Sequence, residues 1–236
     1  MKQIITFPKT LLVIASLLLS FLWTLFCAVV GTTVGFFSKT LGNRIHWLWC
    51  LGVVKLMGIK ISILGAENIP KQGGIIFAAN HQSMFDIFVL GSLNLGFKWI
   101  AKAELARVPF IGRTMKTLGF YFVQRNHSEN DKSTLDSVAS DLKAGARIAI
   151  FPEGTRSKTG QLLPLKKGAF RLSQSTDVPL LPIRIRGTFE IAPPKQIPLR
   201  RSFDVTVQIY PRLVIPESEA GITDAMKQFE SLMQGA

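Results

Sequence analysis

The chain begins with a long apolar stretch. No charged residue occurs at positions 10–38, and the segment 11–37 is rich in Leu, Val, Phe and Ile. This length exceeds the ~20 residues that a helix needs to cross the hydrocarbon core of a bilayer. A cleaved signal peptide would have a shorter apolar region and a small-residue cleavage site, which Ala15 and Ala28 do not form convincingly. The pattern therefore predicts a retained membrane segment.

A second apolar segment, 45–59, differs in composition from the first. It contains Trp47 and Trp49, and the cations Arg44 and Lys60 flank it. Tryptophan and lysine at its edges favour a helix lying at a membrane surface, whereas a buried core helix explains the apolar positions equally well. The two segments together form either a spanning anchor or a hairpin that dips into one leaflet.

From residue 60 onward, short apolar runs alternate with stretches of helical periodicity. The runs predict strands at 60–64, 74–79, 97–101, 120–123, 147–151, 180–185 and 204–210, and the periodic stretches predict helices at 83–93, 109–118, 130–144, 168–175 and 222–233. Strands separated by helices indicate an α/β fold, a largely parallel mixed sheet flanked by helices on both faces. We therefore expect membrane-anchoring helices in residues 1–59 and an α/β domain in residues 60–236.

The run 75–79 is charge-free and predicts an interior strand, so His81 lies just past a strand end. Ser83, followed three residues later by Asp86, predicts a helix start with Ser83 as N-cap and Asp86 in the first turn. The intervening turn allows the imidazole to fold back over that helical turn. A carboxylate on one ring nitrogen would fix the tautomer and leave the other as a general base. A local hydrogen-bonding histidine beside a helix cap is the alternative explanation.

Cations follow three further predicted strands. Lys102 follows the strand 97–101, Arg125 follows 120–123, and Arg156 follows 147–151. Ligands of parallel sheets gather at the carboxyl ends of the strands. Convergence of these side chains with His81 would create a basic pocket for a phosphate, although a solvated surface cation is the commoner explanation for any one of them.

Composition narrows the function classes. Two cysteines and three histidines argue against a disulfide framework or a structural zinc site. The net charge of +13 suits nucleic acid or an anionic membrane, and because no nucleic-acid module occurs, we expect a membrane surface as the partner and no nucleic acid. Neither a P-loop nor a G-x-G-x-x-G sequence occurs, which disfavours a nucleotide-binding enzyme. The absence of G-x-S-x-G disfavours a serine hydrolase built on Ser83 or Ser157.

Four ordered sequence blocks resemble a known family. The block 80–86, NHQSMFD, is followed by 151–157, FPEGTRS, and the blocks 119–125 and 178–183 match as well. Together they resemble the glycerolipid acyltransferase superfamily, and most closely the 1-acyl-glycerol-3-phosphate acyltransferases. The resemblance covers about residues 63–186.

The resemblance implies transfer of a fatty acyl group from a thioester, carried by coenzyme A or acyl carrier protein, to the 2-hydroxyl of lysophosphatidic acid. The product would be phosphatidic acid. It assigns His81 as general base and Asp86 as the group that orients it. Because a thioester is already activated and thiolate leaves readily, we expect neither a cofactor nor a metal.

By the same analogy, the glycerol phosphate would be held by Arg125, Glu153, Gly154, Thr155 and Arg156, with help from Lys102. A carboxylate does not itself attract a phosphate, so we expect Glu153 to orient Arg156 or to accept from a hydroxyl. Segment 178–183 would contribute to the acyl-donor side.

Alternatives remain at this stage. The acceptor could be another lysophospholipid or glycerol 3-phosphate, because the catalytic block is shared, and a non-enzymatic, membrane-bound phospholipid-binding protein is a further possibility. We expect the catalytic domain on the cytoplasmic face of its membrane, the inner membrane in a bacterium, because thioester donors reside there. Cations at Arg44, Lys55 and Lys60 agree with that orientation.

Overall fold

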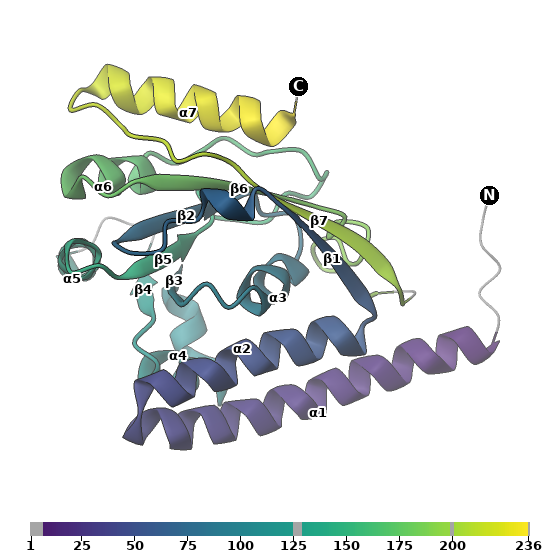
Figure 1. Ribbon diagram of the computed structural model, residues 1–236. Helices are drawn as coiled ribbons and strands as arrows, with labels where there is room; N and C mark the ends of the chain where they lie inside the picture. Colours follow the sequence, from purple (N-terminus) through teal and green to yellow (C-terminus); the bar gives the residue numbers. More distant parts are fainter. Residues whose placement is uncertain (1–6, 125–128, 199–200, 236) are drawn as a thin grey trace.

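The computed structural model describes residues 7–124, 129–198 and 201–235. A single sheet with helices on both faces forms the body of the molecule, and α1 runs along its underside (Figure 1). The strands are β1 (Ile59–Leu64), β2 (Ile75–Ala79), β3 (Phe97–Lys102), β4 (Tyr121–Val123), β5 (Arg147–Ile150), β6 (Leu180–Arg186) and β7 (Phe203–Ile209). The α-helices are α1 (Phe7–Phe37), α2 (Lys39–Leu56), α3 (Phe85–Ser92), α4 (Ile111–Thr117), α5 (Glu129–Lys143), α6 (Gly168–Thr176) and α7 (Glu219–Gln234). Two short 3-10 helices, η1 (Ala66–Asn68) and η2 (Ala103–Arg107), complete the described elements.

The strand order is β1-β7-β6-β2-β5-β3-β4. Strands β6, β2, β5, β3 and β4 pair in parallel, whereas β7 pairs antiparallel with β6 and parallel with β1. The predicted largely parallel mixed sheet is therefore confirmed. Each of the seven predicted strands forms, with its ends within one residue of the predicted ones.

Strand β2 lies at the centre and all five of its residues are buried. Its side chains alternate between the faces of the sheet, as strand geometry requires. Ile75, Phe77 and Ala79 join the core formed with α2 and α3, whereas Ile76 and Ala78 join the core formed with α5, α6 and α7. The sheet thus separates two hydrophobic layers, one beneath it against α2 and α3 and one above it against α5, α6 and α7 (Figure 1).

The second apolar segment differs from the predicted helix at 45–59. Helix α2 begins earlier, at Lys39, because the Ser38 hydroxyl caps it by accepting from the N–H of Leu41 at 3.4 Å. It ends earlier because Gly58, with φ of 67°, turns the chain directly into β1.

The packing of α2 favours the core-helix interpretation over a helix at the membrane surface. Val53, Val54 and Met57 belong to the same core as β2. The indole of Trp47 donates to the carbonyl of Ser92, at the end of α3, at 3.0 Å. Among the described helices, α1 alone is long and apolar enough to cross a membrane, over Thr10–Phe37. The division of the chain near residue 60 stays a prediction.

The start of α3 also differs from the expected cap. Met84 occupies the N-cap position and its side chain makes no capping bond, so the assignment of Ser83 as N-cap is wrong. The Ser83 hydroxyl accepts from the N–H of Phe85 at 3.2 Å and donates to the carbonyl of Ala192 at 2.7 Å. Ser83 is fully buried, and its bond to Ala192 connects this turn to the chain beyond β6. Asp86 lies in the first helical turn, as predicted.

Candidate active site

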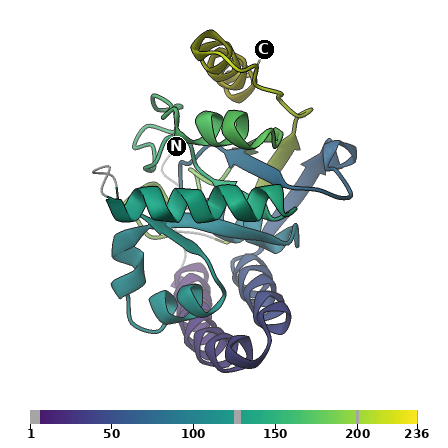
Figure 2. The same ribbon diagram turned by 90° about the vertical axis from the view of Figure 1, so that its left-hand side faces the viewer.

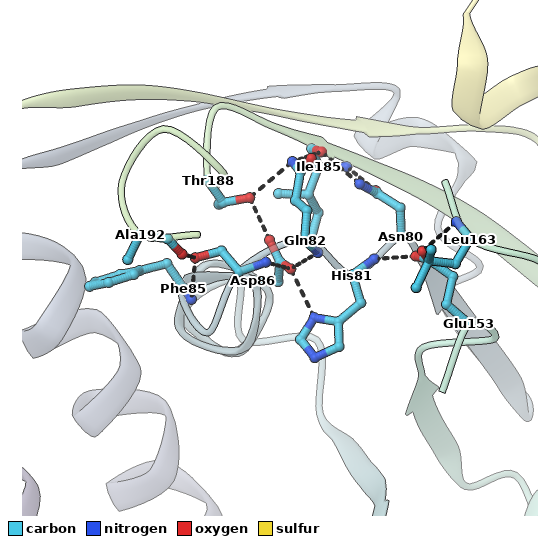
Figure 3. A network of polar contacts seen from close by, with 11 residues as sticks. Asn80, His81, Gln82, Phe85, Asp86, Glu153, Leu163, Ile185, Thr188 and Ala192 are labelled. Atoms are coloured by element: carbon cyan, nitrogen blue, oxygen red, sulfur yellow. Dashed lines mark hydrogen bonds and ion pairs between the residues drawn. The ribbon is translucent and has the colours of Figure 1, made fainter. Parts of the chain in front are cut away.

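His81 and Asp86 meet at the carboxyl end of β2. The Nδ1 atom of His81 lies 2.9 Å from Oδ2 of Asp86, across the turn between β2 and α3 (Figure 3). The His81 side chain retains 12% exposure, whereas Asp86 is fully buried. Within the described residues, Nε2 of His81 has no hydrogen-bond partner. The ring is therefore held through one nitrogen while the other remains available to a ligand.

The carboxylate of Asp86 is compensated by a set of convergent donors. Its Oδ2 atom also accepts from the N–H groups of Gln82 at 2.7 Å and Ser83 at 2.8 Å, and its Oδ1 accepts from the Thr188 hydroxyl at 2.5 Å. A buried carboxylate is stable only when donors of this kind replace its water shell. Asp86 is thereby fixed in position, and it fixes the imidazole in turn.

Two amide side chains tie the His81 turn to β6. Asn80 donates to the carbonyl of Ile185 at 3.0 Å and accepts from its N–H at 2.7 Å. The Gln82 amide donates to the same carbonyl at 2.9 Å and to the Thr188 hydroxyl at 3.1 Å. In Figure 3 these side chains point toward Ile185, away from the imidazole of His81.

Thr188, which contacts both Asp86 and Gln82, is a residue of the candidate site that the sequence interpretation missed. It follows the carboxyl end of β6 by two residues. The rule that ligands gather at strand ends, which selected Lys102 and Arg156, would have selected this position as well.

The imidazole is also fixed by aromatic stacking. Its ring lies 3.9 Å from that of Phe151, with an interplanar angle of 9°. Phe151 in turn stacks on Trp99 of β3 at 5.4 Å and 23°. A stacked ring on one side and a hydrogen bond at Nδ1 together limit rotation of the imidazole, so Nε2 keeps one direction.

Glu153 connects the loop after β5 to the His81 turn. Its side chain is buried; Oε1 accepts from the N–H of His81 at 2.5 Å, and Oε2 accepts from the N–H of Leu163 at 2.8 Å. Burial raises the pKa of Glu153 to about 7, with a smaller contribution from the negative charge of Asp86, while the two backbone N–H groups act in the opposite direction. Both oxygens are thus engaged by backbone, and the expectation that Glu153 orients Arg156 is not met in the described contacts.

The other predicted substrate residues that the structure describes lie at the same edge of the sheet but apart from the His81–Asp86 contact. Lys102 ends β3, and its exposed amine lies 3.4 Å from Oε1 of Glu104. Gly154 has a φ of 67°, Thr155 is exposed and Arg156 is half-buried. Arg125 lies outside the described residues.

A cavity of about 240 Å³ adjoins the His81 turn. Among the predicted phosphate-site residues that the structure describes, Glu153 alone lines it, beside His81. Arg184 and Arg186 of β6 also line it. The sequence interpretation sought cations after the strands 97–101, 120–123 and 147–151 and therefore named neither residue. In β6 the two positions alternate with the buried Ile185.

Chemically, an imidazole held by a carboxylate through Nδ1 can accept a proton at Nε2 from a hydroxyl. Cations at the ends of neighbouring parallel strands can hold an anionic group. No group of three or more His, Cys, Asp or Glu side chains placed to hold a metal ion occurs in the part of the chain that the structure describes.

Comparison with known proteins identifies the family to which the chain belongs. Residues 60–186 match the family described as acyltransferase. The 1-acyl-sn-glycerol-3-phosphate acyltransferase of Saccharomyces cerevisiae is 36% identical over 179 residues, which cover 72% of this chain and 59% of that protein. The chloroplastic enzyme BAT2 of Brassica napus is 38% identical over 152 residues, 64% of this chain and 44% of that protein. The human alpha enzyme is 33% identical over 165 residues, 68% and 58% of the two chains.

A solved structure has the same fold over almost the whole chain. It is the crystal structure of the 1-acyl-sn-glycerophosphate (LPA) acyltransferase PlsC from Thermotoga maritima, with a TM-score of 0.78, 23% identity, and coverage of 96% of this chain and 95% of that one. The chain spans 44–59% of the length of the three curated relatives. The family match covers more than half of the chain and includes β2, His81, Asp86 and Glu153. The protein therefore belongs to the acyltransferase family.

Proposed function

We propose that the protein transfers a fatty acyl group from an acyl thioester to the 2-hydroxyl of 1-acyl-sn-glycerol 3-phosphate, forming phosphatidic acid in phospholipid biosynthesis. The observation that carries the proposal is the His81–Asp86 pair, 2.9 Å apart at the end of the central strand of an acyltransferase-family chain. The names of the relatives supply the acceptor and the class of reaction.

In this mechanism His81 is the general base. Its Nδ1–H donates to Asp86, so the neutral Nε2 removes the proton of the 2-hydroxyl as that oxygen attacks the thioester carbonyl. The carbon–oxygen ester bond forms, the carbon–sulfur bond breaks, and the imidazolium returns its proton to the departing thiolate. General-base catalysis of this kind contributes about 10²–10⁴-fold to the rate.

Asp86 has two roles in the mechanism. Its charge selects the tautomer with Nδ1–H, and it stabilises the imidazolium that forms when His81 has taken the proton. The donations from Gln82, Ser83 and Thr188 hold the carboxylate in position throughout the cycle.

The phosphate of the acceptor is assigned to the cations at the same edge of the sheet. Arg156 follows β5 and Lys102 ends β3, and both strands run in the same direction as β2, so their side chains start from the edge that carries His81. Gly154 and Thr155 supply backbone and hydroxyl donors in the same loop, and Arg125 completes the set by its position after β4. Arginine suits this role because its planar group binds a phosphate through two donors.

The acyl donor is a thioester of coenzyme A or of acyl carrier protein, and both carriers are soluble and cytoplasmic. The acceptor and product are lipids, and the apolar α1 suggests membrane association. We therefore place the catalytic domain at the cytoplasmic surface of the membrane, the inner membrane in a bacterium.

The test is acyl transfer by the purified protein in vesicles. Lysophosphatidic acid, glycerol 3-phosphate and lysophosphatidylcholine are offered separately, each with acyl-coenzyme A and, in a second series, with acylated acyl carrier protein. His81→Ala serves as the inactive variant. We expect phosphatidic acid from lysophosphatidic acid, lost in the variant. Turnover of another acceptor in preference would overturn the substrate, and normal turnover by folded His81→Ala would overturn the mechanism. No product with either donor would indicate a lipid-binding protein.

A further inference from the structure

An exposed group of apolar side chains lies outside the active site, on the stretch of chain that comprises η2, α4 and the residues between them. Three large apolar side chains project from it: Leu105 is 39% exposed, Val108 37% and Phe110 57%. Residues 103–117 follow directly from the carboxyl end of β3, the edge at which Lys102 stands. We refer to residues 103–117 as the η2–α4 segment.

The η2–α4 segment packs beside α1. The Thr114 hydroxyl donates to the carbonyl of Ala28 at 2.9 Å and lies 2.7 Å from the hydroxyl of Thr32. Farther along, a Cβ added to Gly35 would lie 3.0 Å from the Leu118 side chain. In Figure 2 the segment, in teal, lies beside the pair of N-terminal helices at the base of the molecule.

Phe110 stands one helical turn before Thr114, whose hydroxyl contacts the carbonyl of Ala28 on α1. Two residues in that part of α1 are themselves strongly exposed, Phe26 at 57% and Val29 at 53%. Exposed apolar side chains therefore occur on both α1 and the η2–α4 segment, which are joined by the contacts of Thr114.

Phe110 is held in this position by a strained turn. Its φ of 61° and ψ of −59° occupy a region that bulky residues rarely adopt, and the N–H of Ile111 donates back to the carbonyl of Pro109 at 2.6 Å. Gly112 permits the close approach behind it, because a Cβ there would lie 2.6 Å from the carbonyl oxygens of Leu105 and Ala106. The strained backbone conformation therefore holds a phenylalanine whose side chain the described protein leaves largely exposed.

Exposed cations lie close in sequence to the apolar side chains. Arg107, Arg113 and Lys116 are all exposed, and the one acidic residue among positions 102–116, Glu104, lies beside Lys102. A cluster of basic residues next to inserted apolar side chains is the arrangement that binds anionic lipid surfaces.

We propose that the η2–α4 segment is a second membrane contact, in which Leu105, Val108 and Phe110 enter the headgroup region and Arg107, Arg113 and Lys116 contact anionic phospholipids. The contact would hold the carboxyl end of β3, and with it the active-site edge, at the surface from which a lipid acceptor arrives. The inference goes beyond the proposed reaction and rests on the membrane attachment of α1, so its test uses no turnover.

The test measures the depth of single positions in vesicles that contain phosphatidylglycerol. Phe110→Cys and, separately, Val108→Cys are labelled with an environment-sensitive fluorophore in the full chain. The matched control is Val214→Cys, since Val214 is 68% exposed and lies between β7 and α7. Cys27 and Cys50 are buried, and the parent protein treated in the same way is the blank.

We expect a blue shift and quenching by spin-labelled acyl chains at positions 110 and 108, and neither at 214. Two independent positions guard against a variant that misfolds because of the strained turn. Labels at 110 and 108 that remain as water-exposed as the label at 214 would overturn the apolar contact.

A second experiment tests the electrostatic part with the double variant Arg113→Gln and Lys116→Gln. Its binding to vesicles should depend several-fold less on phosphatidylglycerol content than the binding of the parent protein. Unchanged dependence would overturn the electrostatic part.

Discussion

Asp86 illustrates how a single side chain can be tested apart from the fold. In Asp86→Asn the amide oxygen can still accept from the N–H groups of Gln82 and Ser83, and the Thr188 hydroxyl can reverse to accept from the amide nitrogen. The variant should therefore fold, but it lacks the charge that selects the His81 tautomer and stabilises the imidazolium. We expect kcat to fall by about 10²–10⁴-fold with little change in melting temperature.

The matched control for this substitution is Asp136→Asn, because Asp136 is exposed on α5. Steady-state kinetics of both variants measure the change in kcat, and circular dichroism verifies that both are folded. A folded Asp86→Asn enzyme with near-normal kcat would remove Asp86 from the mechanism.

Glu153 makes stability depend on pH. Its pKa is about 7 in the folded protein, against an ordinary value of 4.5, because burial disfavours the charged form. Between these two values the unfolded chain has lost the proton while the folded chain retains it. The contribution of Glu153 to stability is therefore present in full below about pH 4.5 and decreases as pH rises to about 7.

Glu153→Gln removes this titration and leaves either the His81 or the Leu163 N–H facing an amide donor. We expect it to lower the free energy of unfolding by about 1–3 kcal/mol at acid pH. Melting curves from pH 5 to pH 8 should show the difference between the parent and the variant shrinking toward neutrality. A difference that is independent of pH would contradict the assignment of a pKa near 7 to Glu153.

At the scale of elements, the approach of α1 to α2 depends on glycine. A Cβ at Gly42 would lie 2.5 Å from the Leu118 side chain and 2.8 Å from the Cα atom of Gly35. Because the Gly35 contact is backbone, the helices must separate to admit a methyl group. We expect Gly42→Ala to lower stability by about 1–3 kcal/mol.

Gly168→Ala is the control for this element, since a Cβ there meets nothing within 4 Å. Melting temperatures in detergent should fall for Gly42→Ala and stay level or rise slightly for Gly168→Ala. Equal melting temperatures for the two variants would show that the α1–α2 contact tolerates extra volume.

At the scale of the whole molecule, α1 presents apolar side chains that the described structure leaves uncovered, among them Leu11 at 60% and Phe21 at 59% exposure. Burial of such surface in lipid is favoured by the hydrophobic effect. We expect the protein to stay with membranes through washes in high salt and alkaline carbonate and to be released by detergent. Release by either wash would mean that charge alone holds the protein.

The orientation of the molecule is tested by an amine reagent that does not cross membranes. Lys158 is exposed in the loop after β5, so it is open to solvent on the side of the membrane that carries the domain. With the domain in the cytoplasm, the reagent should modify Lys158 after cell lysis but leave it unmodified in intact cells. Modification in intact cells would place the domain outside.

The sequence by itself determined the elements and their type. The seven strands could be predicted because a short apolar run, as in β2, and an alternation of apolar and polar positions, as in β7, are both local properties of the sequence. The α1 segment was predictable for the same reason. The ends of α2 and the cap of α3 were not, since a Ser38 cap and a turn at Gly58 replaced the expected boundaries and the Ser83 hydroxyl turned toward Ala192.

Tertiary structure decided the surroundings of the site. The sequence could pair His81 with Asp86, five positions apart, because a single turn joins them. It could not supply the bond by which Thr188 reaches Asp86 across 102 positions, nor the bonds by which Glu153 holds the His81 and Leu163 backbone. Such contacts arise only when the parallel strands β2, β5 and β6 align their carboxyl ends, and strand pairing over long separations leaves no mark in any local pattern.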